Sequence, residues 1–600
     1  MSASSFPAPY VSTPASSTST ITMILRSPQL EEEIERDEAH IEKYGGNDPE
    51  EPPVKLPPGS PQPPPPKEIV DPNLVTWDGP NDPQNPQNWS HRYKWFITLV
   101  LSMTTLNVTF ASSAPSSTSP FVAADFHTPT EVSYLITSIF LVGYVFGPLF
   151  WGPGSELVGR RPIFILTLSM YTIFHLGQAL AHNMETLLVT RFLSGFFACA
   201  PLTLGGGFIA DVWDPVGRGT ATSVFSSTVF LGPVMGPIIS GFIVESSLGW
   251  RWVYWVMMMF AGACTILAML FLKETYAPIL LLKKARRLRK ADPEGNKHLY
   301  AQAESQKWSF KELLHRTLLR PFNMLMNEPV LVLITIYLSV VYGLLYALFE
   351  AFPVVFIGIH GLTVSQDGLI FIGVGIGTTI GAYLNWWFSR SYATLVEEWR
   401  GFPPAEERLY GAMLAGPCLV IGIFWFGWTG AYVAVPWYVP AISTILIGMS
   451  VSLVFMSFLS YLVDTYLMYS ASAFAANTII RSAVGAAFPL FTVQMFKGMG
   501  VNWACTLIGC IGIVLAPMPL LFYKYGARIR ENSKFAPCIV SAAGFENCER
   551  NQSGTRKRGG LDYGEDINDG RYDAMTLPSG GGYDVTTMDW AILALLTACS

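Results

Sequence analysis

Long apolar runs recur through the middle of the chain, and they constrain its fold more than any other feature. A helix needs about 20 apolar residues to cross roughly 30 Å of hydrocarbon. The chain has twelve such runs, at 96–115, 132–151, 162–180, 187–210, 219–243, 251–272, 329–356, 368–388, 411–429, 436–462, 470–496 and 502–525. They predict twelve transmembrane helices, six on each side of a polar, basic segment.

Two sets of six spans predict an all-α integral membrane protein in which two six-helix bundles surround a central cavity. The acidic residues 31–51 and the proline-rich residues 57–66 cannot bury a core, so the tail that holds them is predicted to be disordered. The predicted regions are a cytosolic N-terminal tail at 1–95, an N-terminal bundle at 96–272, a cytosolic central loop at 273–328, a C-terminal bundle at 329–525 and a cytosolic C-terminal tail at 526–600.

Charge is scarce in this chain, which excludes several classes of protein. Only 14% of the residues are charged, against about 25% in soluble proteins. This argues against a soluble enzyme, and a net charge of −6 gives no reason to expect nucleic acid as a partner. The eight cysteines form neither a CxxC pair nor a metal-ligand set, so no metal and no cofactor are expected.

The distribution of lysine and arginine predicts the orientation, because cytosolic loops carry an excess of these residues. With the N-terminus in the cytosol, the outer loops hold only Arg251 and Lys497. Both termini are therefore predicted to be cytosolic. The basic start of the central loop, LLLKKARRLRK, is either a topology signal or a segment drawn to the anionic cytosolic leaflet.

Charged residues inside a span are costly in lipid and are functional candidates. Only Glu350 lies well inside a span among the acids, and Arg191 and Arg481 are the intramembrane cations. Tyr342, Tyr346 and Glu350 follow an i, i+4, i+8 spacing and share one helical face. This face is predicted to bind a cation or to carry a proton, and the alternative is a packing stripe.

Small residues at regular spacing suggest how the spans meet. Gly232 and Gly236 in span five, Gly143 and Gly147 in span two, and Gly373, Gly377 and Gly381 in span eight recur at i+4. Such stripes let helices approach closely in lipid. We therefore expect span five to meet span eight, and span two to meet span eleven, across the seam between the halves. The alternative is packing within one half.

Three motifs resemble those of the major facilitator superfamily. GPGSELVGRR after span two is similar to the loop signature of that family, although Glu156 replaces the usual Asp and Leu157 a frequent basic residue. The resemblance implies a conformational latch made of Gly152, Glu156, Gly159, Arg160, Arg161 and Asp211. RFLSG implies that Arg191 takes part in proton transfer, and GPVMGP resembles the proton-antiporter motif, with Gly232, Pro233, Gly236 and Pro237.

Further segments resemble fungal twelve-span drug:proton antiporters. They are DPQNPQNWS, GWRWVYW, ETYAPILLLKKA and SASAFAANTIIRS. In the last of them, Asn477 and Arg481 match the pattern of span eleven. Span one lacks the carboxylate that several drug antiporters use for the proton, and it offers only Asn107 as a strongly polar group.

This resemblance implies a proton-coupled exporter of drugs, toxins, fungal metabolites or polyamines that is driven by the proton gradient across the plasma membrane. The expected partners are a small hydrophobic or cationic substrate and the lipid bilayer, and the protein is expected to be a monomer. The alternative is a membrane sensor that does not transport. An integral membrane enzyme is not supported, because the chain has no HExxH or GxSxG motif.

Overall fold

The computed structural model describes residues 71–536 of the chain, apart from 72, 306–318, 391, 393–394, 396–403, 467–468, 532 and 534. The predictions made for 1–70 and for 537–600 lie outside these residues. The described part is helical, and its only β-pairing is one isolated bridge between Leu74 and Tyr300. Twelve of its helical stretches are long and apolar enough to cross a membrane.

The first six spans form the N-terminal half, and the sequence-predicted runs lie within or close to them. They are α3 (His91–Ser113), which continues through η2 (Ala114–Thr118) into α4 (Ser119–Asp125), α5 (Thr130–Val158), α6 (Arg160–Ala179), α7 (Met184–Val212), α8 (Pro215–Glu245) and α9 (Arg251–Phe271). A short helix, η1 (Pro86–Asn88), precedes them. After α9 come α10 (Ala277–Ala291) and α11 (Gln302–Ser305).

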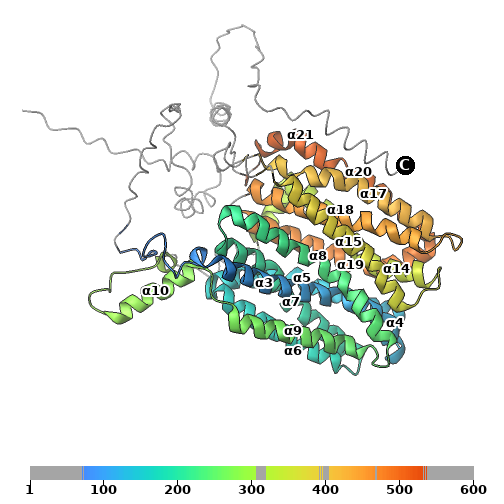
Figure 1. The fold of residues 1–600 in the computed structure, drawn as a ribbon, viewed down its shortest axis with the longest axis horizontal. Helices are drawn as coiled ribbons and strands as arrows, with labels where there is room; N and C mark the ends of the chain where they lie inside the picture. Colours follow the sequence, from blue (N-terminus) through green and yellow to red (C-terminus); the bar gives the residue numbers. More distant parts are fainter. Residues whose placement is uncertain are drawn as a thin grey trace, which may run out of the picture. The chain divides into compact units, whose positions relative to one another are not determined.

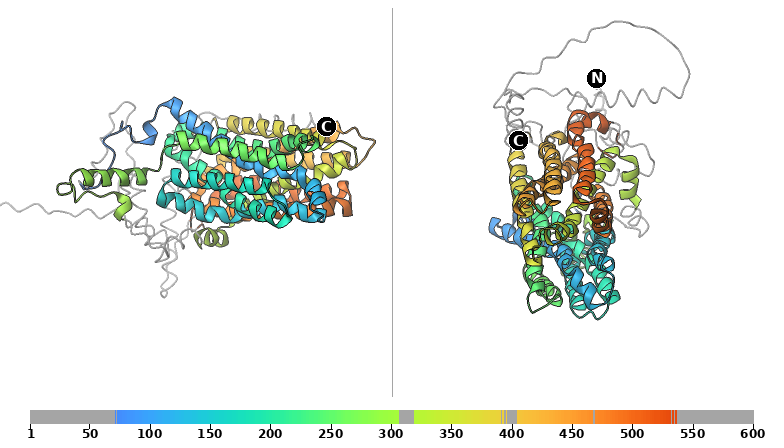
Figure 2. Two further views of the ribbon diagram at one scale, coloured as in Figure 1. Left: turned by 90° about the horizontal axis from the view of Figure 1, so that it is seen from below. Right: turned by 90° about the vertical axis from the view of Figure 1, so that its right-hand side faces the viewer.

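The C-terminal half repeats the arrangement of six spans. They are α14 (Pro329–Phe352), extended by η4 (Pro353–Ile357), α15 (Val364–Phe388), α17 (Tyr410–Gly430), α18 (Tyr438–Tyr466), α19 (Ser470–Met499), and α20 (Val501–Leu515) with α21 (Met518–Glu531). Two shorter helices, α13 (Arg320–Asn327) and η5 (Ala405–Arg408), precede α14 and α17. The two halves form separate groups of helices in the views of Figures 1 and 2.

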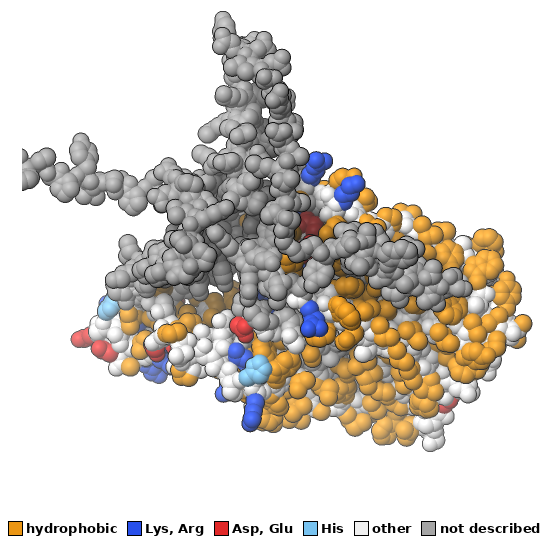
Figure 3. Space-filling view, turned by 45° about the horizontal axis from the view of Figure 1, so that its top comes forward, with side chains coloured by type: hydrophobic (Ala, Val, Ile, Leu, Met, Phe, Trp, Pro, Cys, Tyr) orange, Lys and Arg blue, Asp and Glu red, His pale blue; other side chains and the backbone are white. Residues whose placement is uncertain are grey.

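Apolar side chains cover most of the visible helical surface, and Lys and Arg gather toward one end (Figure 3). Exposed Leu270, Val514 and Trp387 are typical of this surface. Such a belt suits contact with lipid chains. The chain is therefore a multi-pass membrane protein. We call the end that holds Arg160 and Asp211 the inner end and the opposite end the outer end, following the predicted orientation.

The two halves meet along two pairs of helices. α8 packs along α15, and α5 packs along α19. This confirms the predicted pairing of span five with span eight and of span two with span eleven. An apolar groove of about 390 Å³ follows the first seam, lined by residues of α8 and α15 that include Val234, Gly375 and Ile376.

The glycine stripes that suggested this pairing pack within each half, so the reason given for it was wrong. A Cβ on Gly232 or Gly236 would collide with α3, and one on Gly143 would collide with α7. A Cβ on Gly377 or Gly381 would collide with α18. A glycine lets a helix approach any neighbour closely, and the i+4 spacing does not say which neighbour that is.

Other glycines make the close contacts of the α8–α15 seam, and they lie toward the outer end. Gly241 faces Val364, and Gly368 faces the backbone of Pro237. At the same end, Ser365 donates from its backbone N and its Oγ to the Glu245 carboxylate, at 3.0 and 2.6 Å. The structure is therefore closed between the halves at the outer end of this seam.

The end of the predicted disordered tail is ordered, which corrects the boundary drawn at residue 95. α3 begins at His91, and Val75 packs against Ala285 of α10 and Ala301. The Lys284 Nζ lies 2.6 Å from the Asp78 carboxylate and donates to the Thr76 carbonyl at 2.9 Å. We call residues 73–82, 279–288 and 299–301 together the loop clip. The tail orders here because α10 offers it an apolar side and a buried cation.

Helix α10 leaves the inner end and extends away from the bundle (Figures 1 and 2). Ile279 and Ala285 on this helix are buried. A helix that lies on a membrane needs its apolar side free for the lipid. The apolar side of α10 is therefore partly covered by protein, and both interpretations of this basic segment stay predictions.

Candidate functional site

Two tyrosines on α14 occupy the junction of the halves. Tyr342 and Tyr346 lie one turn apart, with ring centroids 4.9 Å apart and hydroxyl oxygens 3.5 Å apart. The Tyr346 hydroxyl is hydrogen-bonded to the Ser112 hydroxyl of α3 at 2.7 Å. This contact joins a helix of the N-terminal half to one of the C-terminal half.

Arg481 of α19 lies against the same tyrosines. Its guanidinium carbon is 4.7 Å from the centre of the Tyr342 ring and 5.2 Å from that of Phe455. Tyr342, Tyr346 and Tyr144 of α5 are the groups within electrostatic range of it. The residue is 8% exposed, and its Nε has no hydrogen-bond partner in the described part of the chain. We call Tyr144, Tyr342, Tyr346 and Arg481 the Tyr–Arg site.

Glu350 shares a helix with these tyrosines but has different neighbours, so the predicted stripe divides into two sites. It is 4% exposed and lies close enough to Asp367 of α15 for their charges to interact. It also acts electrostatically on Tyr134 of α5. Asp367 is 5% exposed. Among the described residues, neither Glu350 Oε1 nor Asp367 Oδ1 has a hydrogen-bond partner.

We call Glu350 and Asp367 the carboxylate pair. Two buried acids at close range repel each other when both are charged, and the loss of water adds to the cost. Protonation removes this cost and turns an acceptor into a donor. The pair can therefore bind and release a proton as its surroundings change.

Arg191 of α7 lies deep in the N-terminal half, with no exposed surface. Its Nε donates to the Ile136 carbonyl at 3.1 Å, and its Nη1 donates to the Ala111 carbonyl at 3.1 Å. Its guanidinium carbon lies 4.3 Å from the centre of the Phe140 ring. These contacts let Arg191 hold α3 and α5 together, while its Nη2 has no hydrogen-bond partner among the described residues.

The two predicted asparagines are fully buried, one in each half. Neither amide atom of Asn107 or of Asn477 has a hydrogen-bond partner within the described residues. Asn477 lies one turn before Arg481 on α19. Buried amides need partners, which in a transporter core are water or substrate. Asn107 and Asn477 can therefore supply polar contacts to either.

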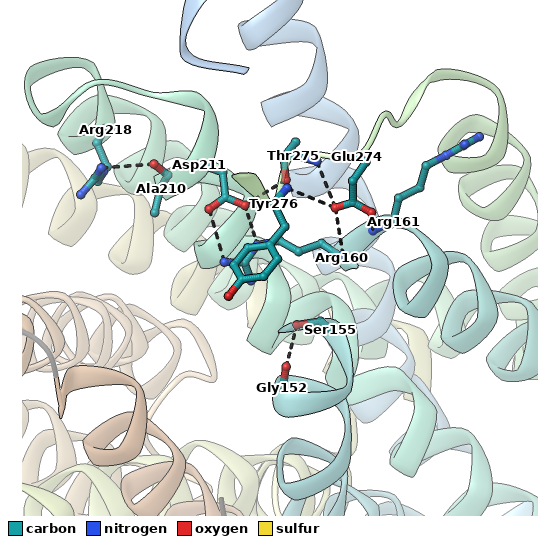
Figure 4. A network of polar contacts seen from close by, with 10 residues as sticks. All are labelled: Gly152, Ser155, Arg160, Arg161, Ala210, Asp211, Arg218, Glu274, Thr275 and Tyr276. Carbon is teal, nitrogen blue, oxygen red and sulfur yellow. Dashed lines mark hydrogen bonds and ion pairs between the residues drawn. The ribbon is translucent and has the colours of Figure 1, made fainter. Parts of the chain in front are cut away.

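Two of the predicted latch residues, Arg160 and Asp211, form an ion pair at the inner end (Figure 4). The Nε of Arg160 donates to the Asp211 carboxylate at 2.5 Å, and Thr275 Oγ1 donates to the same oxygen at 3.0 Å. Glu156 is within electrostatic range of Arg160. The guanidinium carbon of Arg160 also lies 5.0 Å from the centre of the Tyr276 ring. An acid at the C-terminal end of α7 opposes the helix dipole, and Arg160 compensates it.

Glu274 completes this network, although the sequence analysis did not identify it. Its carboxylate accepts hydrogen bonds from the backbone N–H groups of Arg160, at 3.0 Å, and Arg161, at 3.3 Å. It therefore caps the N-terminus of α6, where N–H groups lack partners within the helix. Gly159 enables this cap, because its φ is +114° and a Cβ there would collide with the Glu274 carboxylate.

The two remaining latch residues make local contacts (Figure 4). Arg161 donates from its Nη2 to the Met269 carbonyl at 3.1 Å, which ties α6 to α9. The Gly152 carbonyl accepts a hydrogen bond from Ser155 at 2.6 Å. Neither residue joins the ion pair of Arg160 with Asp211. The interacting side chains are therefore fewer than the residues of the predicted latch.

Replacing Glu274 with alanine is expected to lower the thermal stability of the protein. The change removes the cap of α6, and lost caps cost about 0.5–2 kcal/mol. The melting temperature in detergent would measure this. Glu294→Ala is the matched control, because Glu294 is exposed. Equal melting temperatures for the two variants would show that the cap contributes nothing.

A second ion-pair network lies at the corresponding place in the C-terminal half. Arg408, before α17, donates to the Asp464 carboxylate near the end of α18 at 2.8 Å. Tyr392 donates to the same oxygen at 2.6 Å. Arg160 and Asp211 hold the equivalent places before the third and at the end of the fourth span. Each half therefore has its own ion pair between these two places.

The proposed antiporter motif has a specific structural role in α8. Pro237 has no N–H, so the carbonyl of Pro233 loses its helical partner. Ser113 replaces that partner by donating from its Oγ to the Pro233 carbonyl at 2.9 Å. Gly232 and Gly236 allow α3 to approach closely enough for this bond. The four motif residues thus join α8 to α3.

The family model described as "Major Facilitator Superfamily" matches residues 100–489, which is most of the described chain. The chain belongs to the major facilitator superfamily. The match includes the Tyr–Arg site, the carboxylate pair and the ion pair of Arg160 with Asp211. The protein is therefore a membrane transporter by family, with an all-helical, twelve-span fold.

Named fungal members of the superfamily are similar along most of the chain. The citrinin biosynthesis cluster transporter mrr1 of Monascus ruber is 43% identical over 470 residues, which cover 78% of this chain and 93% of that protein. The efflux pump MFS2 of Trichophyton rubrum is 42% identical over 470 residues, covering 78% of each. These relatives are named as transporters and an efflux pump, not as enzymes.

Solved structures of the superfamily share the fold at low sequence identity. The human organic anion transporter MFSD10 is 17% identical, with a TM-score of 0.50, and the match covers 73% of this chain and 99% of that one. The xylose transporter XylE of E. coli, in a partially occluded inward-open conformation, is 18% identical, with a TM-score of 0.51, and the match covers 72% of this chain and 99% of XylE.

Two residues of this transporter were missed as site candidates. Asp367 lies one residue before the predicted span 368–388, so it did not count as an acid inside a span. The seam closes over that end, and the first turn of α15 favours an acid there. Glu274 lies outside every span, two residues beyond the predicted end of span six, and its signals were that position and its place at the start of ETYAPILLLKKA.

Proposed function

We propose that this transporter exports small organic metabolites in exchange for protons by alternating access. The observation that carries this proposal is the carboxylate pair, because its two acids are buried at a seam between the halves that must open when the outer side is exposed. The proposed location is the plasma membrane, with both termini in the cytosol, in keeping with the distribution of Lys and Arg.

The pair links proton binding to movement of the halves. When the outer side is open, water reaches Glu350 and Asp367, and their oxygens exchange protons with the exterior. Closing the outer side removes this water. Because charged carboxylates are costly to bury, the seam closes more readily when Glu350 and Asp367 are protonated. Protons taken up outside thus favour the return to the conformation described here, and their release to the cytosol completes the exchange.

Relatives support an export role. The names of the transporters of the citrinin and ascochitine biosynthesis clusters place them with the synthesis of fungal metabolites, and one relative is named an efflux pump. A transporter that serves such a pathway has a small organic molecule as its substrate. We therefore propose a small fungal metabolite as the substrate here.

Transport by the purified protein in liposomes tests the proposal. Extracts of a metabolite-producing fungus would supply candidate substrates, and mass spectrometry would identify those moved against their gradient. We expect accumulation with an imposed proton gradient and little without it. Accumulation that is the same with and without the proton gradient would contradict proton coupling. No movement of any compound would favour the alternative of a membrane sensor.

A further inference from the structure

Arg481 is a buried cation for which the described residues supply no counter-ion. It is 8% exposed, and no carboxylate in the described part of the chain pairs with it. Its contacts are the Tyr342 and Phe455 rings, which lie 4.7 and 5.2 Å from its guanidinium carbon. Its Nε has no hydrogen-bond partner among the described residues. Ring faces compensate only part of a buried charge.

Two comparisons within the structure mark this residue as unusual. Arg191 is more deeply buried, and two backbone carbonyls accept from it at 3.1 Å, although its Nη2 has no hydrogen-bond partner among the described residues. Glu350 and Asp367 are also buried, yet each can become neutral by taking up a proton. A guanidinium keeps its charge at any physiological pH. Arg481 therefore differs from the acids, because a proton cannot neutralise it, and from Arg191, because its Nε has no hydrogen-bond partner among the described residues whereas that of Arg191 donates to a carbonyl.

The surroundings of Arg481 indicate the chemistry of a ligand. Tyr342 and Tyr346 give aromatic faces from α14, and Tyr144 adds a phenol from α5 across the seam. The hydroxyls of Tyr346 and Ser112 lie 2.7 Å apart, and a hydroxyl can donate to an anion. Helices of both halves thus surround one cation, three aromatic rings and several O–H groups.

We propose that the Tyr–Arg site binds an aromatic organic anion, whose carboxylate or phenolate pairs with the Arg481 guanidinium while its ring packs on Tyr342 and Tyr346. This names the substrate class of the proposed exporter and rests on that function. It replaces the sequence expectation of a cationic substrate. A polyamine would place further positive charge beside Arg481, which the buried setting makes costly.

Binding of three naphthalene probes to the purified full-length protein tests the inference. The probes are naphthoate, its neutral methyl ester and the cationic naphthylmethylamine, with affinity measured by quenching of tryptophan fluorescence. We expect naphthoate to bind about tenfold or more tightly than the other two, because charge-assisted hydrogen bonds contribute strongly in a buried site. Equal binding of the three probes, or tighter binding of the amine, would overturn the proposal.

Variants then assign the preference to Arg481. Arg481→Gln is expected to bind naphthoate and its ester equally, and Arg481→Lys is expected to keep part of the preference. The matched control is Lys497→Gln, which removes a positive charge from an exposed position of the same helix. If Arg481→Gln does not fold, the three probes on the unmodified protein still decide the question.

Failure of the proposed function gives a different result. Selective binding of naphthoate without transport would support the anion site and contradict the proposed export function. Proton-coupled transport that prefers the amine would support the export function and contradict the anion site.

Discussion

Glu350→Gln is expected to abolish proton-driven transport while leaving exchange of substrate between the two sides of the membrane. Glutamine has nearly the shape of a protonated glutamate, so the halves can still close, but it can neither bind nor release a proton. We expect gradient-driven accumulation in liposomes to fall at least about tenfold, equivalent to about 1.4 kcal/mol. Exchange at equal concentrations on both sides should fall much less.

Asp367→Asn is expected to give the same pattern, because the two acids form one proton site. Glu185→Gln, at an exposed position in the first turn of α7, is the matched control and should transport normally. Full accumulation in Glu350→Gln would exclude Glu350 as the essential proton carrier. Loss of exchange as well as of accumulation would instead indicate that the substitution impairs substrate binding or the movement of the two halves.

Gly368→Val is expected to hold the outer side open. A Cβ at this position would lie against the backbone of Pro237 across the seam, where no flexible side chain can move aside. Overpacking of this kind costs about 1–3 kcal/mol. The cost falls on the conformation in which α8 and α15 touch, so the balance between conformations should shift by about 5- to 150-fold. Transport should fall accordingly.

Ser365→Cys offers a direct measure of this opening. Ser365 is buried in the seam against Glu245, so its cysteine should react slowly with a membrane-impermeant thiol reagent added at the outer side. Adding Gly368→Val should speed that reaction. Gly206→Val is the control, because the position has open space around it. An unchanged reaction rate with Gly368→Val would show that the seam tolerates the added side chain.

The sequence was sufficient for the spans, because these depend on a simple property of the chain. Lipid demands long apolar runs, and no other feature of the chain resembles them. Small residues correctly marked α5, α8 and α15 as helices with close neighbours. They could not distinguish contacts within a half from contacts across it, as Gly377 and Gly368 on α15 show, since both lie on the same helix and face different partners.

The site was predicted less completely, because the neighbours of a side chain depend on the orientation of each helix about its axis and on where the helices cross. The i+4 spacing placed Tyr342, Tyr346 and Glu350 on one face, yet only the two tyrosines share a site. Glu350 pairs with Asp367, which is contributed by the next helix. Arg408 and Asp464 had a signal in the sequence, since they stand where Arg160 and Asp211 stand in the first half, but the halves are too different for this to be evident.

The loop clip gives a point of attachment for following the transport cycle. Its three segments flank the N-terminal half, one before α3 and two after α9, so the clip should travel with that half as a rigid extension. A fluorophore on Lys283, which is exposed on α10, would sit outside the membrane on a lever joined to moving helices. Paired with a second dye on the C-terminal half, it would report each rocking movement of single molecules in real time, with every residue of the transport path unaltered.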